Sequence, residues 1–433
     1  MGVLPQNFLT HSLRLHPRRD SITRILSAAI RSADAGEAVK NFLHENPLPP
    51  AKRVFAFGLG KAAPAMTSAL ADILPLTNSL LVTKHASGLN LKAGEVIAGN
   101  HPIPGADSLA AGRAARKFVS RLTPDDLLIC LISGGGSALM AEPLIPLEEL
   151  QALTSALLAS GASIHEVNTV RRHLDSLKGG GMVQAANGAR IVSLILSDVV
   201  GDSLETIVSG PTAPDPSTVE DARAVVDRIA NSIPQTEAGQ ISNLTYKFRE
   251  TPKPGDSVFE RVSNHIIASN GIALEAAKRQ ANAEGFFCEV IETNLQGEAR
   301  EVGQHLSESL VVATRSHSRP FCLLAGGETT VTVRGNGRGG RNQELALAAV
   351  ESLRGVEDAM LVSLATDGED GPTDAAGAVV TGKTSGRAES LAMASSAFLS
   401  ANDAYSFFAS LGDLIQPGPS GTNVNDLVLM FAF

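Results

Sequence analysis

The sequence is poor in the residues on which secreted, zinc-binding and membrane proteins depend. It has no tryptophan and three cysteines in 433 residues, and Cys130, Cys288 and Cys322 each lie in an apolar run without a second cysteine close by. This spacing argues against a disulfide framework and a zinc site. No eighteen uncharged apolar residues follow one another, and the first twenty residues lack a continuous apolar core. We therefore expect neither a membrane span nor an export signal.

Positive charge is also scarce. The chain has 36 lysines and arginines against 45 aspartates and glutamates, which gives a formal net charge of −9. Proteins that bind nucleic acid or anionic membranes need a basic surface, and this sequence has no basic stripe. We expect no nucleic-acid partner, no membrane partner and a cytoplasmic location. Any anion that the protein binds is then small and is recognised locally.

Glycine, by contrast, is abundant, with 40 residues. Strand-like and helical segments alternate before and after a polar, proline-containing interval at residues 230–257, which predicts two α/β domains. We assign residues 1–255 to the first domain and residues 256–433 to the second, and leave open that the final residues return to the first. Residues 20–45 show helical periodicity and predict one amphipathic helix.

The most distinctive stretch is residues 321–344, FCLLAGGETTVTVRGNGRGGRNQE. It predicts an apolar strand, an acidic turn, a second strand over residues 328–334, a glycine-rich loop and a helix that begins near Arg341. Six of its 24 residues are glycine, which indicates a close approach of backbone amides to a ligand. Arg338 and Arg341 add bidentate positive charge, and the helix start adds unpaired amides. We expect a phosphate group to bind at this loop, on Gly337, Arg338 and Gly339.

A second glycine turn, within residues 53–66, joins an apolar strand to a helix and carries Lys61 at the helix start. It is similar to a Walker phosphate loop, but Phe55 and Ala62 stand where that loop needs a glycine and a magnesium-binding hydroxyl. It is therefore not a Walker loop. Two interpretations stay open: Lys61 contacts a phosphate, or the segment is an ordinary strand-to-helix turn with an exposed lysine.

A third glycine cluster follows an apolar strand at residues 126–132. It predicts an anion-binding nest at a helix start, formed by Ser133, Gly134, Gly135, Gly136 and Ser137. The alternative is a sharp bend, for which fewer glycines suffice. Asp198 and Asp202 lie just beyond the strand at residues 191–196, where open α/β sheets bind ligands. They are candidates for a metal contact, a substrate hydroxyl or a base role, although Asp202 suits a helix cap better.

Two further segments carry charged side chains. Residues 163–177 predict a helix that brings Asn168, Arg171, Arg172 and Asp175 together on adjacent turns, before Lys178 and three glycines. A solvated charged face explains that spacing as well as a ligand site does. After the strand at residues 359–365 come four acids in eight residues, most of which suit Asp–Gly turns. Asp367, immediately after the strand, is the candidate ligand among them. His101, before Pro102, is a rigid turn or a ligand contact.

These loops supply amides, cations and acids after strand ends, which is the inventory of phosphoryl transfer. A rival is dinucleotide binding, because Gly335, Gly337 and Gly340 satisfy G-x-G-x-x-G. The preceding strand alternates with polar residues, however, and Asp367 follows Gly335 by 32 residues where a ribose-binding acid is expected after about 20. An NAD(P)H-dependent oxidoreductase is thus the second hypothesis, and a non-catalytic sugar-acid or nucleotide-binding protein the third.

Eight segments spread over nearly the whole chain match the motifs of one family: GLGKAA, ISGGGSALM, NTVRRHLDSLKGGG, LSDVVGD, GPTAPDPST, AGGETTVTVRGNGRGGRNQE, TDGEDGPTDAAGA and GTNVNDL. With them the chain resembles the class II glycerate 2-kinases, whose C-terminal half is called MOFRL. The resemblance implies two α/β/α sandwich domains, the first Rossmann-like with a mainly parallel sheet and the second with a mixed sheet. It also implies an active site in the cleft between them. Proteins of this kind are often labelled hydroxypyruvate reductases, although this sequence lacks a sound nicotinamide site.

The same resemblance implies ATP-dependent phosphorylation of D-glycerate at its 2-hydroxyl with Mg²⁺, by a monomer or homodimer. By motif match, Lys61 and Arg341 correspond to the family's catalytic cations. Asp198 is the third residue that we expect to be catalytic. The loop of residues 133–137 then serves the nucleotide phosphates. The remaining implied roles are substrate binding by Asn168, Arg171, Lys178 and Asn342, and metal binding by Glu328 and Asp367.

Three positions depart from the family pattern. Leu59 stands where alanine is usual, Gly105 replaces an acid after the His101 turn, and Asn402 stands where histidine is usual. The first change is mild. The other two argue against a direct substrate role for residues 103–106 and for Asn402.

Overall fold

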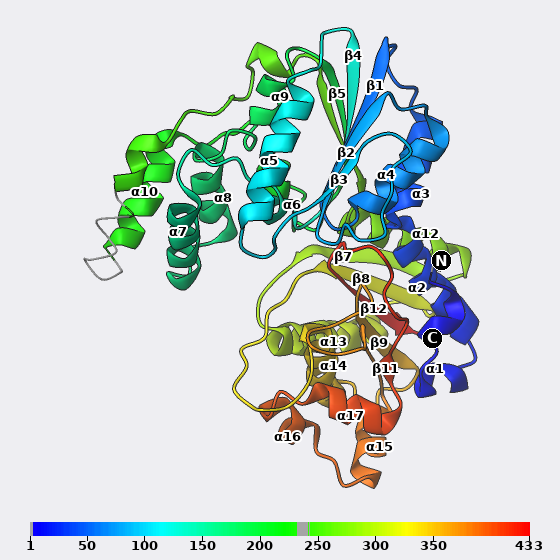
Figure 1. The fold of residues 1–433 in the computed structure, drawn as a ribbon. Helices are drawn as coiled ribbons and strands as arrows, with labels where there is room; N and C mark the ends of the chain where they lie inside the picture. The colour runs from blue at the N-terminus through cyan, green and yellow to red at the C-terminus, as the bar shows by residue number, and fades with distance from the viewer. Residues whose placement is uncertain (1–2, 232–240, 242) are drawn as a thin grey trace. The chain divides into compact units, whose positions relative to one another are not determined.

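The computed structural model describes residues 3–231, 241 and 243–433 (Figure 1). The chain forms two compact units: unit 1 comprises Met1–Asp34 and Ala268–Phe433, and unit 2 comprises Ala35–Ile267. Residues 1–34 thus group with the C-terminal part of the chain and residues 256–267 with the middle part, whereas the prediction placed one boundary after residue 255. Within the predicted boundary interval, residues 232–240 and 242, Pro234 among them, lie outside the described residues.

Unit 2 is built on a six-stranded sheet with the order β3-β2-β1-β4-β5-β6. Its strands are β1 (Arg53–Leu59), β2 (Asn78–Thr83), β3 (Glu95–Ala98), β4 (Asp126–Ile132), β5 (Arg190–Leu196) and β6 (Val262–Ala268). Every neighbouring pair from β3 to β5 is parallel. β4 is buried along its whole length, as expected of a parallel strand covered on both faces. The predicted mainly parallel sheet is confirmed.

Helices cover both faces of this sheet (Figure 1). The helices of unit 2 are α3 (Ala35–Glu45), α4 (Ala63–Ile73), α5 (Ala106–Val119), α6 (Gly136–Leu139), α7 (Leu147–Ala159), α8 (Ile164–His173), α9 (Gly181–Ala185) and α10 (Val219–Ala230). α5 packs on the face that carries Phe57 and Cys130. α4 lies on the opposite face, where Gly58 is needed because a Cβ there would stand 2.6 Å from the Thr67 hydroxyl. A separate apolar cluster joins α7, α8 and α10.

Unit 1 contains a mixed sheet with the order β11-β10-β9-β12-β8-β7, as predicted for the second domain. Its strands are β7 (Phe287–Leu295), β8 (Phe321–Gly327), β9 (Ala359–Ala365), β10 (Gly377–Thr381), β11 (Leu414–Ile415) and β12 (Asp426–Ala432). β7 and β8 are parallel, whereas β12 is antiparallel to both β8 and β9. The final strand of the chain therefore lies inside this sheet.

The helices of unit 1 are α1 (His11–Leu15), α2 (Arg19–Ser32), α12 (Asn270–Ala283), α13 (Ala299–Ser316), α14 (Arg341–Ser352), α15 (Thr384–Ser390), α16 (Ser395–Ser400) and α17 (Ala404–Leu411). α13, α14 and α17 share one apolar core with β8 and β12. On the other face, α12 lies over β8, where Asn270 and Leu274 pack on Gly326, and α2 packs on α12. Both units are thus α/β/α sandwiches, which confirms the predicted fold class.

Two predicted elements were wrong. The single helix over residues 20–45 is two helices, α2 and α3, because the helix stops at Ala33, whose carbonyl accepts a hydrogen bond from the Thr422 hydroxyl. The strand predicted over residues 328–334 is an irregular segment with one isolated bridge, Glu298 with Thr330. Its backbone pairs with the loop before α13 instead of joining the sheet: the Thr330 amide donates to Gly297 and the Thr332 amide to Glu298.

Candidate active-site loops

In unit 2, the turns after β1 and β4 are joined by backbone contacts at the carboxyl edge of the parallel sheet. The Lys61 amide donates to the Gly134 carbonyl at 3.0 Å, and the Ala62 amide donates to the Ser133 hydroxyl at 3.0 Å. Gly60 has a φ of +123°, and a Cβ there would stand 2.1 Å from the Ser133 carbonyl oxygen. The two predicted loops therefore form one structure, in which Gly60 permits the close approach.

The amides of Gly134, Gly135, Gly136 and Ser137 donate no hydrogen bond within the described part of the chain. Buried or half-buried amides are normally paired, so a row of unpaired ones marks a place for an acceptor. Gly135 has a φ of +85°, the left-handed conformation that turns successive amides toward one point. The predicted anion-binding nest therefore keeps its donors available.

Lys61 lies over this nest. Its Cε stands 3.2 Å and its Cγ 3.4 Å from the point where a Cβ on Gly135 would be. The lysine side chain is exposed, and no carboxylate of the described residues forms an ion pair with it. An ammonium group that forms no ion pair within the described residues, beside unpaired amides, favours the binding of an anion at this loop.

Asp198, beyond β5, lies against the same loop. A Cβ on Gly134 would stand 1.8 Å from the Asp198 Oδ2 atom, so only glycine leaves room for the carboxylate. The structure therefore brings together three of the predicted features: Lys61, the nest and Asp198. It also adds His101, whose ring Cδ2 lies 3.4 Å from the Cβ point of Gly135.

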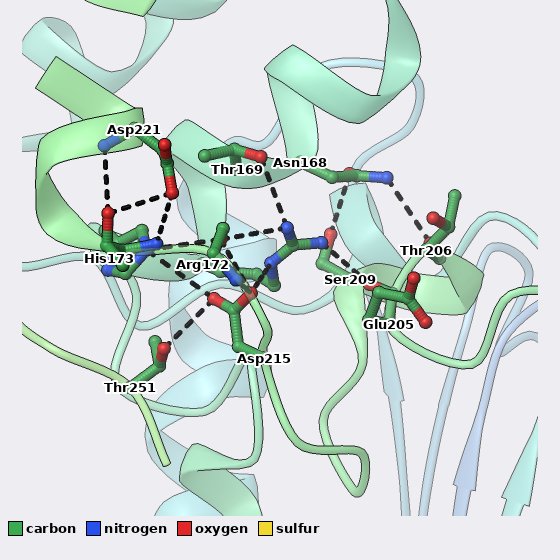
Figure 2. Close-up of polar contacts among 12 residues, drawn as sticks. Asn168, Thr169, Arg172, His173, Glu205, Thr206, Ser209, Asp215, Asp221 and Thr251 are labelled. Carbon is green, nitrogen blue, oxygen red and sulfur yellow. Dashed lines mark hydrogen bonds and ion pairs between the residues drawn. The ribbon is translucent and has the colours of Figure 1, made fainter. Parts of the chain in front are cut away.

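A chain of hydrogen bonds runs from Ser137 of the nest through Ser209 and Asn168 to Thr206, and its part from Ser209 to Thr206 is drawn in Figure 2. The hydroxyls of Ser137 and Ser209 lie 3.0 Å apart, and Ser209 donates to Asn168 Oδ1 at 3.0 Å. The Asn168 amide group donates to the Thr206 carbonyl at 3.4 Å. Asn168 is buried, so its observed contacts are those of a residue that positions Ser209 and the loop.

Arg172 and Asp215 form a buried ion pair next to this chain, with Nε and Oδ1 2.9 Å apart (Figure 2). Arg172 also donates to the Glu205 carbonyl at 3.0 Å, and His173 contacts the Arg249 carbonyl through Nδ1 at 2.7 Å. Asn168, Arg172 and Asp175 are buried, so this part of the charged helix is not a solvated face.

The other two predicted substrate contacts of unit 2 differ in charge balance. Lys178 is buried and donates to Asp175 at 2.7 Å and to the Met140 carbonyl at 3.1 Å, so its charge is neutralised. Arg171 is half-buried, and its side chain forms no ion pair or hydrogen bond within the described residues. Burial lowers the pKa of Arg171. Of Asn168, Arg171 and Lys178, Arg171 is thus the side chain that is left to meet an anion.

In unit 1, Arg341 is already held by carboxylates. Its Nε and Nη2 atoms donate to Asp426 at 2.6 and 3.1 Å, and its Nη1 donates to Glu328 at 2.6 Å. Burial raises the pKa of Asp426 to about 6, although the hydrogen bonds from Arg341 oppose this shift. Sequence reasoning missed Asp426, which begins the last strand. Three of the five guanidinium N–H groups are engaged, which leaves two for a ligand.

The start of α14 is capped from within the protein, contrary to the prediction that its unpaired amides face a phosphate. The Asp370 carboxylate accepts hydrogen bonds from the Asn342 and Gln343 amides at 3.2 and 2.9 Å. Asn342, a predicted substrate contact, is itself buried and accepts a hydrogen bond from Ser363 at 2.7 Å. A carboxylate at a helix N-terminus takes the place that a phosphate would occupy.

The glycine-rich loop before α14 is packed on residues 401–403. The Asn402 side-chain oxygen accepts from the Arg334 and Gly335 amides at 2.8 and 2.9 Å, and Asp403 accepts from the Arg338 amide at 3.0 Å. A Cβ on Gly335 or Gly337 would stand within 2.4 Å of this backbone or of the Asp403 side chain. Close packing therefore explains two of the three fingerprint glycines. Of the three phosphate contacts predicted in this loop, Gly337, Arg338 and Gly339, only the Gly339 amide donates no hydrogen bond among the described residues.

The two predicted metal ligands of unit 1 are single carboxylates. Asp367 is half-buried, burial raises its pKa, and one of its oxygens accepts from the Glu369 amide at 3.1 Å. Glu328 is paired with Arg341. Within the described residues, no three His, Cys, Asp or Glu side chains are grouped to hold a metal ion. Mg²⁺ on substrate phosphates commonly uses only one or two carboxylates, so Asp367 fits that use.

Two family models match the chain: the domain of unknown function DUF4147 over residues 21–239 and the MOFRL family over residues 321–426. A glycerate 2-kinase of Pyrococcus horikoshii is 40% identical over 94% of this chain and 95% of its own length. The chain belongs to the DUF4147–MOFRL family of glycerate 2-kinases. A D-glycerate 2-kinase of Thermotoga maritima is also 40% identical, over 94% of this chain and 96% of that protein.

A solved structure of the family has the same fold as this chain, and the family members differ in the activity for which they are named. The crystal structure of a Thermotoga maritima glycerate kinase matches with a TM-score of 0.86 at 38% identity, and covers 95% of this chain and 98% of that one. A relative from Agrobacterium vitis, 38% identical over 94% of this chain and 93% of its own length, is named a putative hydroxypyruvate reductase. The family resemblance predicted from the sequence motifs is confirmed.

Proposed function

We propose that this protein transfers a phosphoryl group from ATP to the 2-hydroxyl of D-glycerate and so forms 2-phosphoglycerate. The observation that carries the proposal is the loop of residues 133–137, where four amides donate no hydrogen bond within the described residues and the side chain of Lys61 lies beside them. Such preorganised donors stabilise the charge of a transferring phosphoryl group. The names of the family members supply the acceptor.

We assign the residues of unit 2 different roles in this reaction according to their charge and hydrogen-bonding groups. Lys61 and the amides of residues 134–137 bind phosphate oxygens and stabilise their charge. Asp198, next to Gly134, contacts a substrate hydroxyl or a metal ion. Asn168 and Ser209 position the loop, and Arg171 is the cation that meets the carboxylate of the acceptor.

In unit 1, Arg341 is the second catalytic cation of the proposal. Asp426 and Glu328 orient its guanidinium, and its remaining N–H groups bind phosphate oxygens. Gly337, Arg338 and Gly339 contribute less than the unit 2 loop, because most of the neighbouring amides already have partners. Arg338 stacks on Tyr405, with its guanidinium carbon 3.9 Å from the ring centre.

Mg²⁺ would be held by Asp367, with Glu328 as the second candidate, and would neutralise charge on the donor phosphates. The half-buried Asp367 carboxyl suits this role because a cation favours its charged form, which burial alone disfavours. Equilibrium dialysis of Mn²⁺ with the wild type and with Asp367→Asn, each with ADP, tests this assignment without measuring turnover.

The NAD(P)H-dependent hydroxypyruvate reductase is the second candidate, favoured by the label of the Agrobacterium vitis relative. Two contacts argue against dinucleotide binding and so against the reductase. Asp370 caps the α14 amides that would hold a pyrophosphate, and Gly335 and Gly337 pack on residues 401–403. A non-catalytic sugar-acid or nucleotide-binding protein is the third candidate. Turnover separates this third candidate from both enzymes.

The test is incubation with ATP, Mg²⁺ and D-glycerate, followed by measurement of ADP and the phosphorus spectrum of the product. A parallel reaction follows NAD(P)H oxidation by hydroxypyruvate. ADP with 2-phosphoglycerate supports the kinase, whereas cofactor oxidation without ADP contradicts it.

The described chain contains no helix long and apolar enough to cross a membrane. The cytoplasmic location and the monomeric or homodimeric state stay predictions.

A further inference from the structure

The loop that carries His101 is fixed at its base. It connects β3 to α5, and the Asn100 side-chain oxygen accepts hydrogen bonds from the Asp107 and Ser108 amides at 3.0 and 3.3 Å. The Asn100 amide in turn donates to the Ser108 hydroxyl at 3.0 Å. The start of α5 therefore holds Asn100, and with it the backbone from which the His101 ring projects.

The His101 ring lies over the anion-binding nest. Its Cδ2 atom stands 3.4 Å from the Cβ point of Gly135, and the Lys61 Cε stands 3.2 Å from the same point. Cδ2 is the ring atom recorded nearest this point, and Nε2 is bonded to it. Neither ring nitrogen has a hydrogen-bond partner among the described residues, and the residue is half-buried. The imidazole is therefore available to a ligand that binds the nest.

Its surroundings keep the ring neutral. Burial lowers the pKa of His101, and the charges of Lys61 and Lys84 lower it further. Lys61 follows β1, Lys84 follows β2, and the nearest acid beside the nest is Asp198 on the Gly134 side. A neutral imidazole has a free lone pair at neutral pH, which a proton acceptor needs.

We infer that His101 is the general base of the proposed phosphoryl transfer and takes the proton of the acceptor hydroxyl at Nε2. The acceptor O–H bond breaks and its proton forms the imidazolium. The acceptor oxygen forms the new O–P bond, while the bond from phosphorus to the bridging oxygen of the donor breaks and leaves its electron pair on the departing diphosphate. The imidazolium then releases its proton to solvent. This inference rests on the proposed function.

The bound substrates change the basicity of this ring in a defined direction. In the free protein two lysines disfavour the imidazolium, but donor phosphates on the nest bring negative charge next to it and favour it. The pKa that governs turnover of the complex is therefore higher than the one that governs the free protein. Because kcat/KM for Mg-ATP reports the enzyme before the donor binds and kcat reports the full complex, the acidic limb of kcat should lie at higher pH than that of kcat/KM for Mg-ATP.

The experiment measures kcat and KM for D-glycerate and for Mg-ATP from pH 5 to 9, for wild type, His101→Gln and His101→Asn. His305→Gln, which changes an exposed histidine of α13, is the matched control. We expect kcat of both His101 variants to fall about 100-fold, with KM changed less than about threefold and the acidic limb lost. His305→Gln should match wild type throughout. Thermal melting of each variant confirms that it is folded.

Three results would overturn the inference. A His101→Gln protein that keeps the acidic limb has another base. A loss confined to KM makes His101 an anion contact rather than a base. Full activity of either folded variant removes the residue from the chemistry. If wild type itself makes no ADP from ATP and D-glycerate, the proposed function fails and the inference fails with it, whereas an active wild type with active His101 variants contradicts the inference alone.

Discussion

Lys61→Met isolates the charge of the unit 2 site with little other disturbance. Methionine keeps an apolar stem over Gly135, and the lysine side chain is exposed and has no ion pair among the described residues. Surface changes of this kind alter the free energy of unfolding by less than about 0.5 kcal/mol. Removing one preorganised donor to a transition-state oxygen, by contrast, lowers kcat roughly 10²- to 10³-fold, or about 3 to 4 kcal/mol. The variant should therefore be folded and nearly inactive.

The assay couples ADP release to an optical readout and compares Lys61→Met with Lys117→Met, which removes an exposed charge from the last turn of α5. Melting curves of the three proteins should coincide. The loss in Lys61→Met should appear in kcat more than in KM, since the donor acts on charge that develops during transfer. A kcat within threefold of wild type, or a loss that Lys117→Met shares, would refute the role of Lys61.

Other predictions concern the carboxylates and the glycines. Arg341→Ala should destabilise the protein by about 3 to 5 kcal/mol because it leaves buried Asp426 without its partner. Urea denaturation should therefore show a lower free energy of unfolding for this variant than for Lys61→Met. The folded-state pKa of Asp426 is raised from 3.8 to about 6, so its contribution to stability should fall by about 3 kcal/mol as the pH rises through that window. Asp426→Asn should lack this slope in urea titrations, and equal slopes would contradict it. Gly134→Ala should lower kcat at least tenfold, because the added methyl group displaces the Asp198 carboxylate. This is roughly the loss expected when one polar contact of an active site is misplaced. Normal turnover would show that Asp198 does not belong to the site. Asn402→Ala should weaken ADP binding measured by calorimetry if the loop of residues 334–338 contacts the nucleotide, and unchanged affinity would mean that it does not.

The sequence predicted the sheets, their class and the loops at the strand ends because those features follow from local patterns. Apolar runs marked β1, β4, β5, β8 and β9, and the glycines after β1 and β4 marked the turns that do meet. The helix at residues 20–45 was misread because periodicity continues across the break, and only the distant Thr422 shows where it stops. Residues 328–334 alternate like a strand but pair with the loop before α13.

The charge balance of the site was beyond the reach of local pattern. Arg341 and Asp426 are 85 residues apart in sequence, and Asp370 reaches the Gln343 amide across 27 residues. A motif shows that a cation or a row of amides exists, but only the fold shows whether the protein already supplies its partner. Among the described residues, the Gly337 and Arg338 amides and the Arg341 guanidinium have such partners, whereas the amides of residues 134–137 have none. This reverses the order of importance that the glycine content indicated. His101 carried a weak signal, since a histidine before a proline is more often a turn.

The most direct test is a crystal structure with Mg-ADP bound, since the central claim is that the unpaired amides of residues 134–137 hold a phosphate. We predict phosphate oxygens about 2.7 to 3.2 Å from these amides, the usual hydrogen-bond range, with the Lys61 ammonium beside them. A nucleotide whose phosphates lie on residues 337–341 alone, with Asp370 displaced from the start of α14 and the amides of residues 134–137 still unpaired, would contradict the account.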